Sequence, residues 1–195
     1  MSVSPVPPGF RTVTPHLILK NCAAALDFYR QAFGAEEGCR MPGPGGSIMY
    51  AEFKVGDSMI MAAEECEMPG VPLKSPTSAG CATVTVGLYV ADCDAWFGRA
   101  VKAGAKALMP PTDMFWGDRY GMVADPFGVV WSIATHKEDV SPEEMGKRMA
   151  AQFGQGGMRA IAAAIARQTT GQTAACGQWR QGIGLDRGLV EGDAA

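Results

Sequence analysis

Apolar and polar residues along this chain follow one pattern that occurs twice. In each occurrence, a segment with alternating apolar positions is followed, after four further residues, by a cysteine and then by a stretch with helical spacing. The alternating segments are residues 12–17, which lead to Cys22, and residues 83–88, which lead to Cys93. Because strand side chains alternate with a period of two and a helix face recurs every three or four positions, each half is predicted to begin with a strand and a helix.

The two predicted helices cover residues 23–33 and 94–103, and each is followed by a Gly-Ala pair whose glycine suits the positive φ beyond a helix C-terminus. Each helix carries one apolar stripe, formed by Leu26, Tyr29 and Phe33 in the first and by Trp96, Ala100 and Ala103 in the second. Three strands are predicted after each helix: near 38–41, at 48–55 and at 58–63 in the first half, and near 107–109, at 119–124 and at 129–135 in the second. Each half is therefore a βαβββ module.

These modules predict an α+β fold. One module exposes an apolar sheet face that it cannot cover alone, so we expect paired βαβββ modules to form a curved, cleft-bearing mixed sheet of about eight strands with the helices outside. The alternative is a duplicated domain whose interior is filled by side chains and holds no ligand. The expected divisions are a proline-rich N-terminal arm (1–11), the first module (12–67), a linker rich in proline and glycine (68–81), the second module (82–137) and a C-terminal helical, partly disordered tail (138–195).

The tail begins with a clear helix start. In the sequence Ser-Pro-Glu-Glu at 141–144, serine suits the N-cap, proline the first helical position and the second glutamate a capping box. This helix is expected to end near Phe153, and an alanine-rich stretch at 158–168 has high helix propensity. From Thr169 onward glycine, glutamine and threonine dominate with little periodicity, so we expect disorder there.

Composition excludes several classes of protein. A net charge of −3 and a pI near 5.4 argue against nucleic-acid binding, which needs a basic surface. No apolar run reaches the roughly 18–20 residues that span a membrane, and residues 2–9 lack the features of a secretory signal. The six cysteines form no Cys-x-x-Cys pair, so we expect reduced thiols in a cytoplasmic protein rather than a metal ribbon or a disulfide framework.

Aromatic and cationic side chains gather just before a tight Asp-Pro-Phe-Gly turn at 125–128. Phe115, Trp116, Arg119 and Tyr120 are candidate ligand-binding residues, because flat rings give apolar contact and a guanidinium can bind a carboxylate or phosphate. The alternative is that the rings close the end of the sheet and that Arg119 pairs with a neighbouring aspartate, either 118 or 125.

The chain has two histidines, and strand alternation gives them different expectations. His16 shares a strand face with Thr14 that points away from the first helix, where it could act as a general base or bind a ligand; the alternative is a histidine satisfied by the backbone. Glu52 is either a second carboxylate of the cleft or an exposed strand residue. His136 ends the last predicted strand and is expected to be a structural surface residue.

Several segments together resemble the vicinal oxygen chelate superfamily, which includes glyoxalase I, bleomycin-resistance proteins and extradiol dioxygenases, and within it the PhnB-like branch. The resemblance is carried by Asp27-Phe28-Tyr29, Phe33-Gly34-Ala35-Glu36, the Phe-Trp-Gly-Asp-Arg-Tyr-Gly sequence at 115–121, the turn at 125–128 and the segment 134–142. It spans about residues 12–150 and implies a sheet cleft.

The resemblance also implies where a metal would bind. Metal-dependent members hold a divalent ion with histidine and glutamate on inward-facing strand positions. Here those positions fall on Thr14, Thr85, Ser132 and either Ile60 or Met61. Hydroxyl, thioether and alkyl groups are poor ligands for such ions, so we expect no metal and no other cofactor. Thr14, Met61, Thr85 and Ser132, with Tyr89 on the face of Thr85, instead become candidate ligand-binding residues.

The sequence therefore predicts a protein that binds a small, apolar or planar ligand in the sheet cleft without the usual metal site. The resemblance implies a homodimer, whose modules either pair within one chain or exchange between chains. The alternative function is a lyase or isomerase of the glyoxalase type, with a rebuilt metal site or with metal-free acid–base catalysis by His16, assisted by Glu52. A third possibility is a structural or regulatory partner of another protein, with the C-terminal helix as adaptor.

Overall fold

The computed structural model describes residues 4–66, 70 and 73–152 of the 195-residue chain. The expectations for the alanine-rich stretch at 158–168 and for the residues beyond it therefore lie outside the described residues, as do parts of the arm and the linker. No described helix is both long enough and apolar enough to cross a membrane.

The first module contains one helix and four strands. In chain order they are β1 (His16–Leu19), α1 (Cys22–Phe33), β2 (Glu36–Pro42), β3 (Ile48–Val55) and β4 (Ser58–Glu64), with a short 3-10 turn, η1 (Pro44–Gly46), between β2 and β3. The strands form a sheet of order β1-β4-β3-β2 in which only the β1–β4 pair is parallel.

The second module repeats this arrangement. It contains β5 (Thr85–Tyr89), α3 (Cys93–Lys102), β6 (Lys106–Asp113), β7 (Asp118–Ala124) and β8 (Val130–His136), and its sheet has the matching order β5-β8-β7-β6. A short helix, α2 (Pro76–Ala79), lies in the linker, and residues 142–152 are helical after the predicted Ser141 N-cap. The internal repeat read from the sequence is confirmed.

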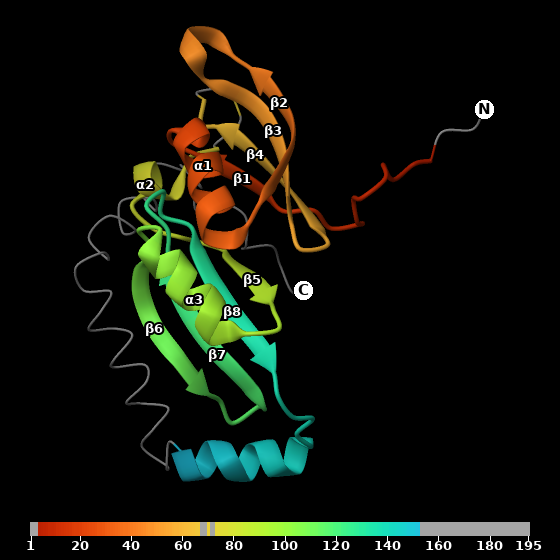
Figure 1. The fold of residues 1–195 in the computed structure, drawn as a ribbon, viewed down its shortest axis with the longest axis vertical. Coiled ribbons are helices and arrows are strands. Elements are labelled where there is room, and N and C mark those ends of the chain that lie inside the picture. The colour runs from red at the N-terminus through yellow and green to blue at the C-terminus, as the bar shows by residue number, and fades with distance from the viewer. Residues whose placement is uncertain (1–3, 67–69, 71–72, 153–195) are drawn as a thin grey trace, which may run out of the picture.

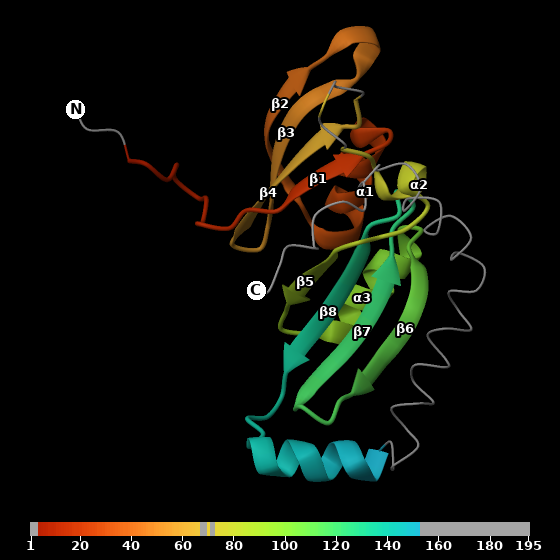
Figure 2. The same cartoon turned by 180° about the vertical axis from the view of Figure 1, so that it is seen from behind.

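The α+β class and the two βαβββ modules are confirmed, but the strands are not hydrogen-bonded into one sheet of about eight. They form two four-stranded sheets, arranged along the long axis of the molecule. Helices α1 and α3 pack against each other and lie on the same side of the sheets (Figure 1). Seen from behind, both sheets lie in front of these helices (Figure 2). We call the sheet surface that faces away from α1 and α3 the cleft face.

Local sequence accounts for the ends of both helices. Asn21 and Asp92 are the N-caps, and their side chains accept hydrogen bonds from the backbone N–H groups three residues ahead. Gly34 and Gly104 follow the helices with φ of 66° and 115°, as the Gly-Ala pairs predicted. By contrast, β6 extends beyond its predicted core at 107–109 and continues through two prolines and two register shifts, which an edge strand tolerates.

The Asp-Pro-Phe-Gly turn joins the two modules. Asp125 is buried, and its Oδ1 accepts hydrogen bonds from the backbone N–H groups of Phe127 and Val129, both at 2.9 Å. Its Oδ2 accepts from the hydroxyl of Tyr29 on α1 and from Nε1 of Trp131 on β8, also at 2.9 Å. Burial raises the pKa of Asp125 despite these four donors. The turn therefore fixes one module on the other.

Candidate functional site

The cleft face of the first sheet carries three of the predicted site residues in one row. His16 on β1 is the register partner of Met61 on β4, which in turn is the partner of Glu52 on β3. Neighbouring strands lie about 4.8 Å apart, so the backbones of His16 and Glu52 are roughly 10 Å apart across Met61. Ala51 and Ala62, the chain neighbours of Glu52 and Met61, point to the opposite face and are fully buried in the core, as strand alternation requires. His16, Met61 and Glu52 therefore share the cleft face of the first sheet.

Tyr50 connects the two candidate catalytic residues of this row. Its ring lies edge-on to the imidazole of His16, with centroids 6.3 Å apart, and its hydroxyl donates to Oε1 of Glu52 at 2.9 Å. Partial burial is the larger cause and the hydrogen bond to Glu52 the smaller one; together they raise the pKa of Tyr50 to about 12. Partial burial also lowers the pKa of His16, so this imidazole is neutral at pH 7 and can accept a proton. Thr14 lies just before β1, where its hydroxyl donates to the carbonyl of Arg11.

The cleft face of the second sheet carries a second group of predicted residues. Strand register places Gly87 beside Ser132, and Ser132 beside Met122. The next row contains Tyr89, Ala134 and Tyr120, and Thr85 lies on the same face at the start of β5. A Cβ at position 87 would lie 3.4 Å from the hydroxyl of Ser132, so glycine leaves a shallow space there. The structure thus brings Thr85, Tyr89, Tyr120 and Ser132 onto one face.

A buried carboxylate, Asp118, organises the aromatic end of this face. The hydroxyl of Tyr89 and Nε1 of Trp116 donate to its Oδ2 at 2.8 and 3.0 Å, and Nδ1 of His136 lies 2.9 Å from its Oδ1. Burial alone would raise the pKa of Asp118, but hydrogen bonds from His136, Tyr89 and Trp116 outweigh it and hold the pKa below its usual value. The ring of Trp116 is edge-on to Tyr120, with centroids 5.5 Å apart.

Sequence reasoning missed Asp118 and the role of His136 in this cluster. Phe115, which was predicted, packs edge-on to Trp116 with centroids 4.9 Å apart. Asp118 and His136 are register partners at the first residue of β7 and the last of β8. The signal that could have identified them is that partnership, which becomes visible only once the two strands are paired across the turn at 125–128.

Arg119 is not brought together with the cleft-face residues. Its Nε and Nη2 donate to the carboxylate of Asp94 on α3 at 2.9 and 2.8 Å, and its Nη1 lies 3.5 Å from Asp113. The predicted alternative of an aspartate partner is therefore right in kind, although the partners are not the aspartates at 118 and 125. Arg119 lines a depression of about 450 Å³ at the start of α3, together with Lys137.

At the positions that the sequence resemblance assigned to metal ligands, the donor groups suit a divalent ion poorly. Met61 and Ser132 offer a thioether and a hydroxyl, and the hydroxyl of Thr14 is directed to a backbone carbonyl. Over the described part of the chain, no group of three or more His, Cys, Asp or Glu side chains is placed to hold a metal ion.

Comparison with known proteins agrees with this architecture. Residues 11–133 match the model of the Glyoxalase/Bleomycin resistance protein/Dioxygenase superfamily. The chain is 40% identical over 141 residues to the uncharacterized protein Mb0911c of Mycobacterium bovis. The aligned region covers 72% of this chain and 93% of that protein.

Two solved structures are similar over about two thirds of the chain. The crystal structure of TioX from Micromonospora sp. ML1 has a TM-score of 0.53 and 27% identity, and covers 65% of this chain and 98% of that one. The structure of PA1353 from Pseudomonas aeruginosa has a TM-score of 0.52 and 27% identity, and covers 66% and 99%. With the match of the family model over most of the two modules, the chain belongs to the glyoxalase/bleomycin resistance/dioxygenase superfamily.

Proposed function

We propose that this protein binds a small apolar or planar ligand on the cleft face of its sheets, without the divalent ion that metal-dependent members of the superfamily use. The observation that carries the proposal is the cluster around Asp118. Tyr89 is 73% exposed although its hydroxyl is anchored to a buried carboxylate. An exposed but oriented aromatic ring is a contact surface for another flat, apolar group.

The neighbouring side chains suit such a ligand. Trp116 is fixed by the same carboxylate as Tyr89, so the two rings lose little conformational freedom when a ligand binds. Gly87 leaves space along the face, and Met122 offers an adaptable apolar contact. Ser132 lies between them, and its hydroxyl offers one polar contact. A few polar groups within an apolar surface are typical of small-molecule sites.

The ligand is best probed with aromatic fragments. We propose a screen of planar heteroaromatic compounds by saturation-transfer NMR, followed by titration of the hits against wild type, Tyr89→Ala and Arg119→Ala. Loss of the Tyr89 ring is expected to weaken binding about fivefold, since an aromatic contact contributes about 1 kcal/mol. Arg119→Ala, on the opposite side of the sheet, is the matched control and should bind within twofold of wild type. Equal weakening by both variants would contradict the site.

We further propose that the protein is a homodimer in which a second copy closes the cleft faces. Within the described residues neither face is covered by a second layer, and Met41 and Tyr89 expose apolar surface there, at 47% and 73%. Exposed apolar sheet faces favour association, and two-fold dimers are the commonest solution. Sedimentation velocity from 1 to 200 µM (concentrations on the order that separates weak from stable dimers) tests this; a monomer throughout the range would refute it.

The second candidate is metal-free acid–base catalysis of the lyase or isomerase type by His16. It is favoured by the neutral imidazole on the cleft face and by Glu52 in the same row. The hemithioacetal of glutathione and methylglyoxal is a suitable test substrate for a protein of this superfamily. If His16 is the catalytic base, turnover should fall at least 100-fold in His16→Gln. Turnover that is unaffected by this substitution would exclude His16, and absent turnover by wild type would exclude this substrate.

A further inference from the structure

His136 holds both of its ring nitrogens against carboxylates. Nδ1 lies 2.9 Å from Oδ1 of Asp118, and Nε2 lies 3.1 Å from Oδ1 of Asp139. A neutral imidazole has one N–H and can donate to only one of these oxygens, whereas the imidazolium donates to both. The observed pair of contacts is therefore the arrangement of a protonated histidine.

The two carboxylates differ in burial, and this difference decides which of the two N–H protons of the His136 imidazolium is lost as the pH rises. The side chain of Asp118 is 5% exposed and that of Asp139 is fully exposed. Asp118 already accepts from Tyr89 and Trp116 on its other oxygen, and a buried carboxylate is costly to leave without its remaining donor. The proton therefore stays on Nδ1 and leaves from Nε2, whose lone pair then faces the carboxylate of Asp139. That contact cannot persist between two acceptors.

The Asp139 contact lies in the connection between the second sheet and the C-terminal helix. Residues 137–140 lie on the loop at 114–117, where the N–H groups of Lys137 and Glu138 donate to the carbonyl of Gly117 at 3.0 and 3.1 Å. The approach is so close that a Cβ on Gly117 would lie 2.1 Å from the carbonyl oxygen of Glu138. Displacement of this segment would therefore also free the loop that carries Trp116.

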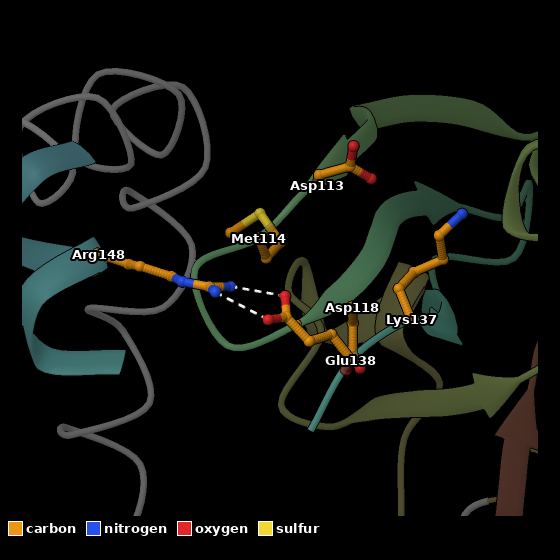
Figure 3. A pocket seen from close by; sticks show the side chains of 7 residues that line it. Asp113, Met114, Asp118, Lys137, Glu138 and Arg148 are labelled. Carbon is orange, nitrogen blue, oxygen red and sulfur yellow. Dashed lines mark hydrogen bonds and ion pairs between the residues drawn. The ribbon is translucent and has the colours of Figure 1, made fainter. Parts of the chain in front are cut away.

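Arg148 extends the connection to the helix at 142–152. Its Nη1 and Nη2 donate to the carboxylate of Glu138 at 2.7 and 2.8 Å (Figure 3), and its Nε donates to Glu144 at 2.9 Å. The helix is thus tied to the same four-residue segment that His136 holds through Asp139. A change at His136 can reach both the aromatic loop and the helix.

We propose that His136 is a protonation-dependent latch. In the closed form the imidazolium joins Asp118 to Asp139 and holds residues 137–140, with the attached helix, against the aromatic loop at 114–117. Loss of the proton from Nε2 releases Asp139 and lets this segment separate from the loop. Because Trp116 and Tyr89 are anchored to Asp118, the latch connects the protonation state of the protein to the order of the aromatic end of the cleft face. The inference does not depend on the proposed ligand.

The charges around His136 favour the protonated form. Direct contacts come from Asp118 on β7 and from Asp139, and Tyr89 on β5 reaches the ring only through Asp118. Farther groups that line a depression of about 230 Å³ beside Asp118 are Asp113 of β6, Lys137, Glu138 and Arg148, and the last two neutralise each other.

Hydrogen bonds to Asp118 and then to Asp139 raise the pKa of His136 above 6.5. The stabilisation of the closed form is therefore complete below pH 6.5 and is lost as the pH rises through the higher value of the folded protein.

The two histidines of the chain make a direct measurement possible. Proton NMR of the imidazole Cε1–H signals against pH should show one histidine titrating above 6.5 and one below, since burial lowers the pKa of His16. His16→Gln assigns the signals by removing the lower one. Asp139→Asn should move the titration of His136 toward 6.5, and the full exposure of the Asp139 side chain makes this variant safe for folding. A His136 that titrates at or below 6.5 would overturn the proposal.

Hydrogen exchange tests whether the titration opens the latch. The protection factors of the Lys137 and Glu138 amides should fall as the pH passes the pKa of His136, about tenfold for each pH unit by which that pKa exceeds 6.5. The Gly128 amide, which donates to the carbonyl of Asp125 in the buried turn, is the control and should not change. In His136→Gln the protection of the two amides should be low at every pH. If His136→Gln does not fold, Asp139→Asn serves in its place and should likewise show low protection of these amides at every pH. Constant protection from about pH 5.5 to 9 in wild type would refute the latch.

Discussion

Removal of one hydroxyl, in Tyr29→Phe, tests how the two modules are held together. Tyr29 on α1 and Asp125 of the second module are 96 residues apart in sequence and are joined by a 2.9 Å hydrogen bond. The substitution keeps the ring, which is fully buried and stacks on Phe53 with centroids 5.2 Å apart. Apolar burial is therefore unchanged, and the measured effect is that of the lost donor.

The expected cost follows from the environment of Asp125. Its carboxylate loses one of four donors, and Oδ2 retains Trp131. Hydrogen bonds to charged groups contribute about 1.5–3 kcal/mol, so the free energy of unfolding at pH 7 should fall by about 2 kcal/mol. When Asp125 is protonated the bond is between neutral groups and contributes about 1 kcal/mol, so the penalty should roughly halve at low pH.

The pH window is set by the direction of the shift of Asp125. Burial raises its pKa above 3.8 in the folded state, so the folded chain takes up this proton before the unfolded chain does. The contribution of Asp125 to stability therefore increases as the pH falls through its folded pKa toward 3.8, the opposite of an ion-paired carboxylate. The smaller penalty of Tyr29→Phe should appear in that window.

Urea unfolding, followed by tryptophan fluorescence at one fixed protein concentration, measures the effect; a fixed concentration is needed because association shifts apparent stability. The matched control is Tyr120→Phe, which removes a tyrosine hydroxyl that is only half-buried on the cleft face. This control should change the free energy of unfolding by less than about 0.5 kcal/mol. A loss of stability in Tyr29→Phe no larger than that in the control would show that this hydrogen bond does not hold the modules together.

Three further substitution and labelling experiments address other parts of the structure. Gly117→Ala should lower the midpoint of urea unfolding, because φ of 99° strains an alanine by roughly 1–3 kcal/mol and its Cβ would meet the carbonyl of Glu138; an unchanged midpoint would show that the contact is absent. At pH 8 the buried Cys22, whose pKa burial raises to about 11, should react with Ellman's reagent at least about 100-fold more slowly than the exposed Cys39, and comparable rates in mass-resolved labelling would contradict its burial. Arg119→Ala should cost less than about 1 kcal/mol in the same unfolding assay, since its ion pairs lie at the surface; a larger loss would mean that the pairs are structural.

The periodicity of the sequence determined the elements and their duplication. Residues 23–33 and 94–103 were predicted as helices from apolar stripes and terminal glycines, and the structure has helices at Cys22–Phe33 and Cys93–Lys102. These features are local: a helix face recurs within one turn, and a glycine with positive φ acts on its own residue. For the same reason, strand alternation indicated the sheet face on which His16 lies without knowledge of its partners, whereas the two alternatives for Glu52, a cleft carboxylate or an exposed strand residue, stayed open until the strands were paired.

Only the tertiary structure decided which of these residues meet. The contacts between Asp118 and His136 and between Tyr29 and Asp125 join positions 18 and 96 residues apart, and the first requires the register of β7 on β8. Arg119 faces α3 because the position after Asp118 points to the other side of the sheet, where Asp94 lies in the first turn of that helix. The formation of two four-stranded sheets in place of one, with α1 packed against α3, likewise involves contacts between elements that are distant in sequence. Periodicity specifies the face on which a side chain lies, but register and packing between distant elements select the partner on that face.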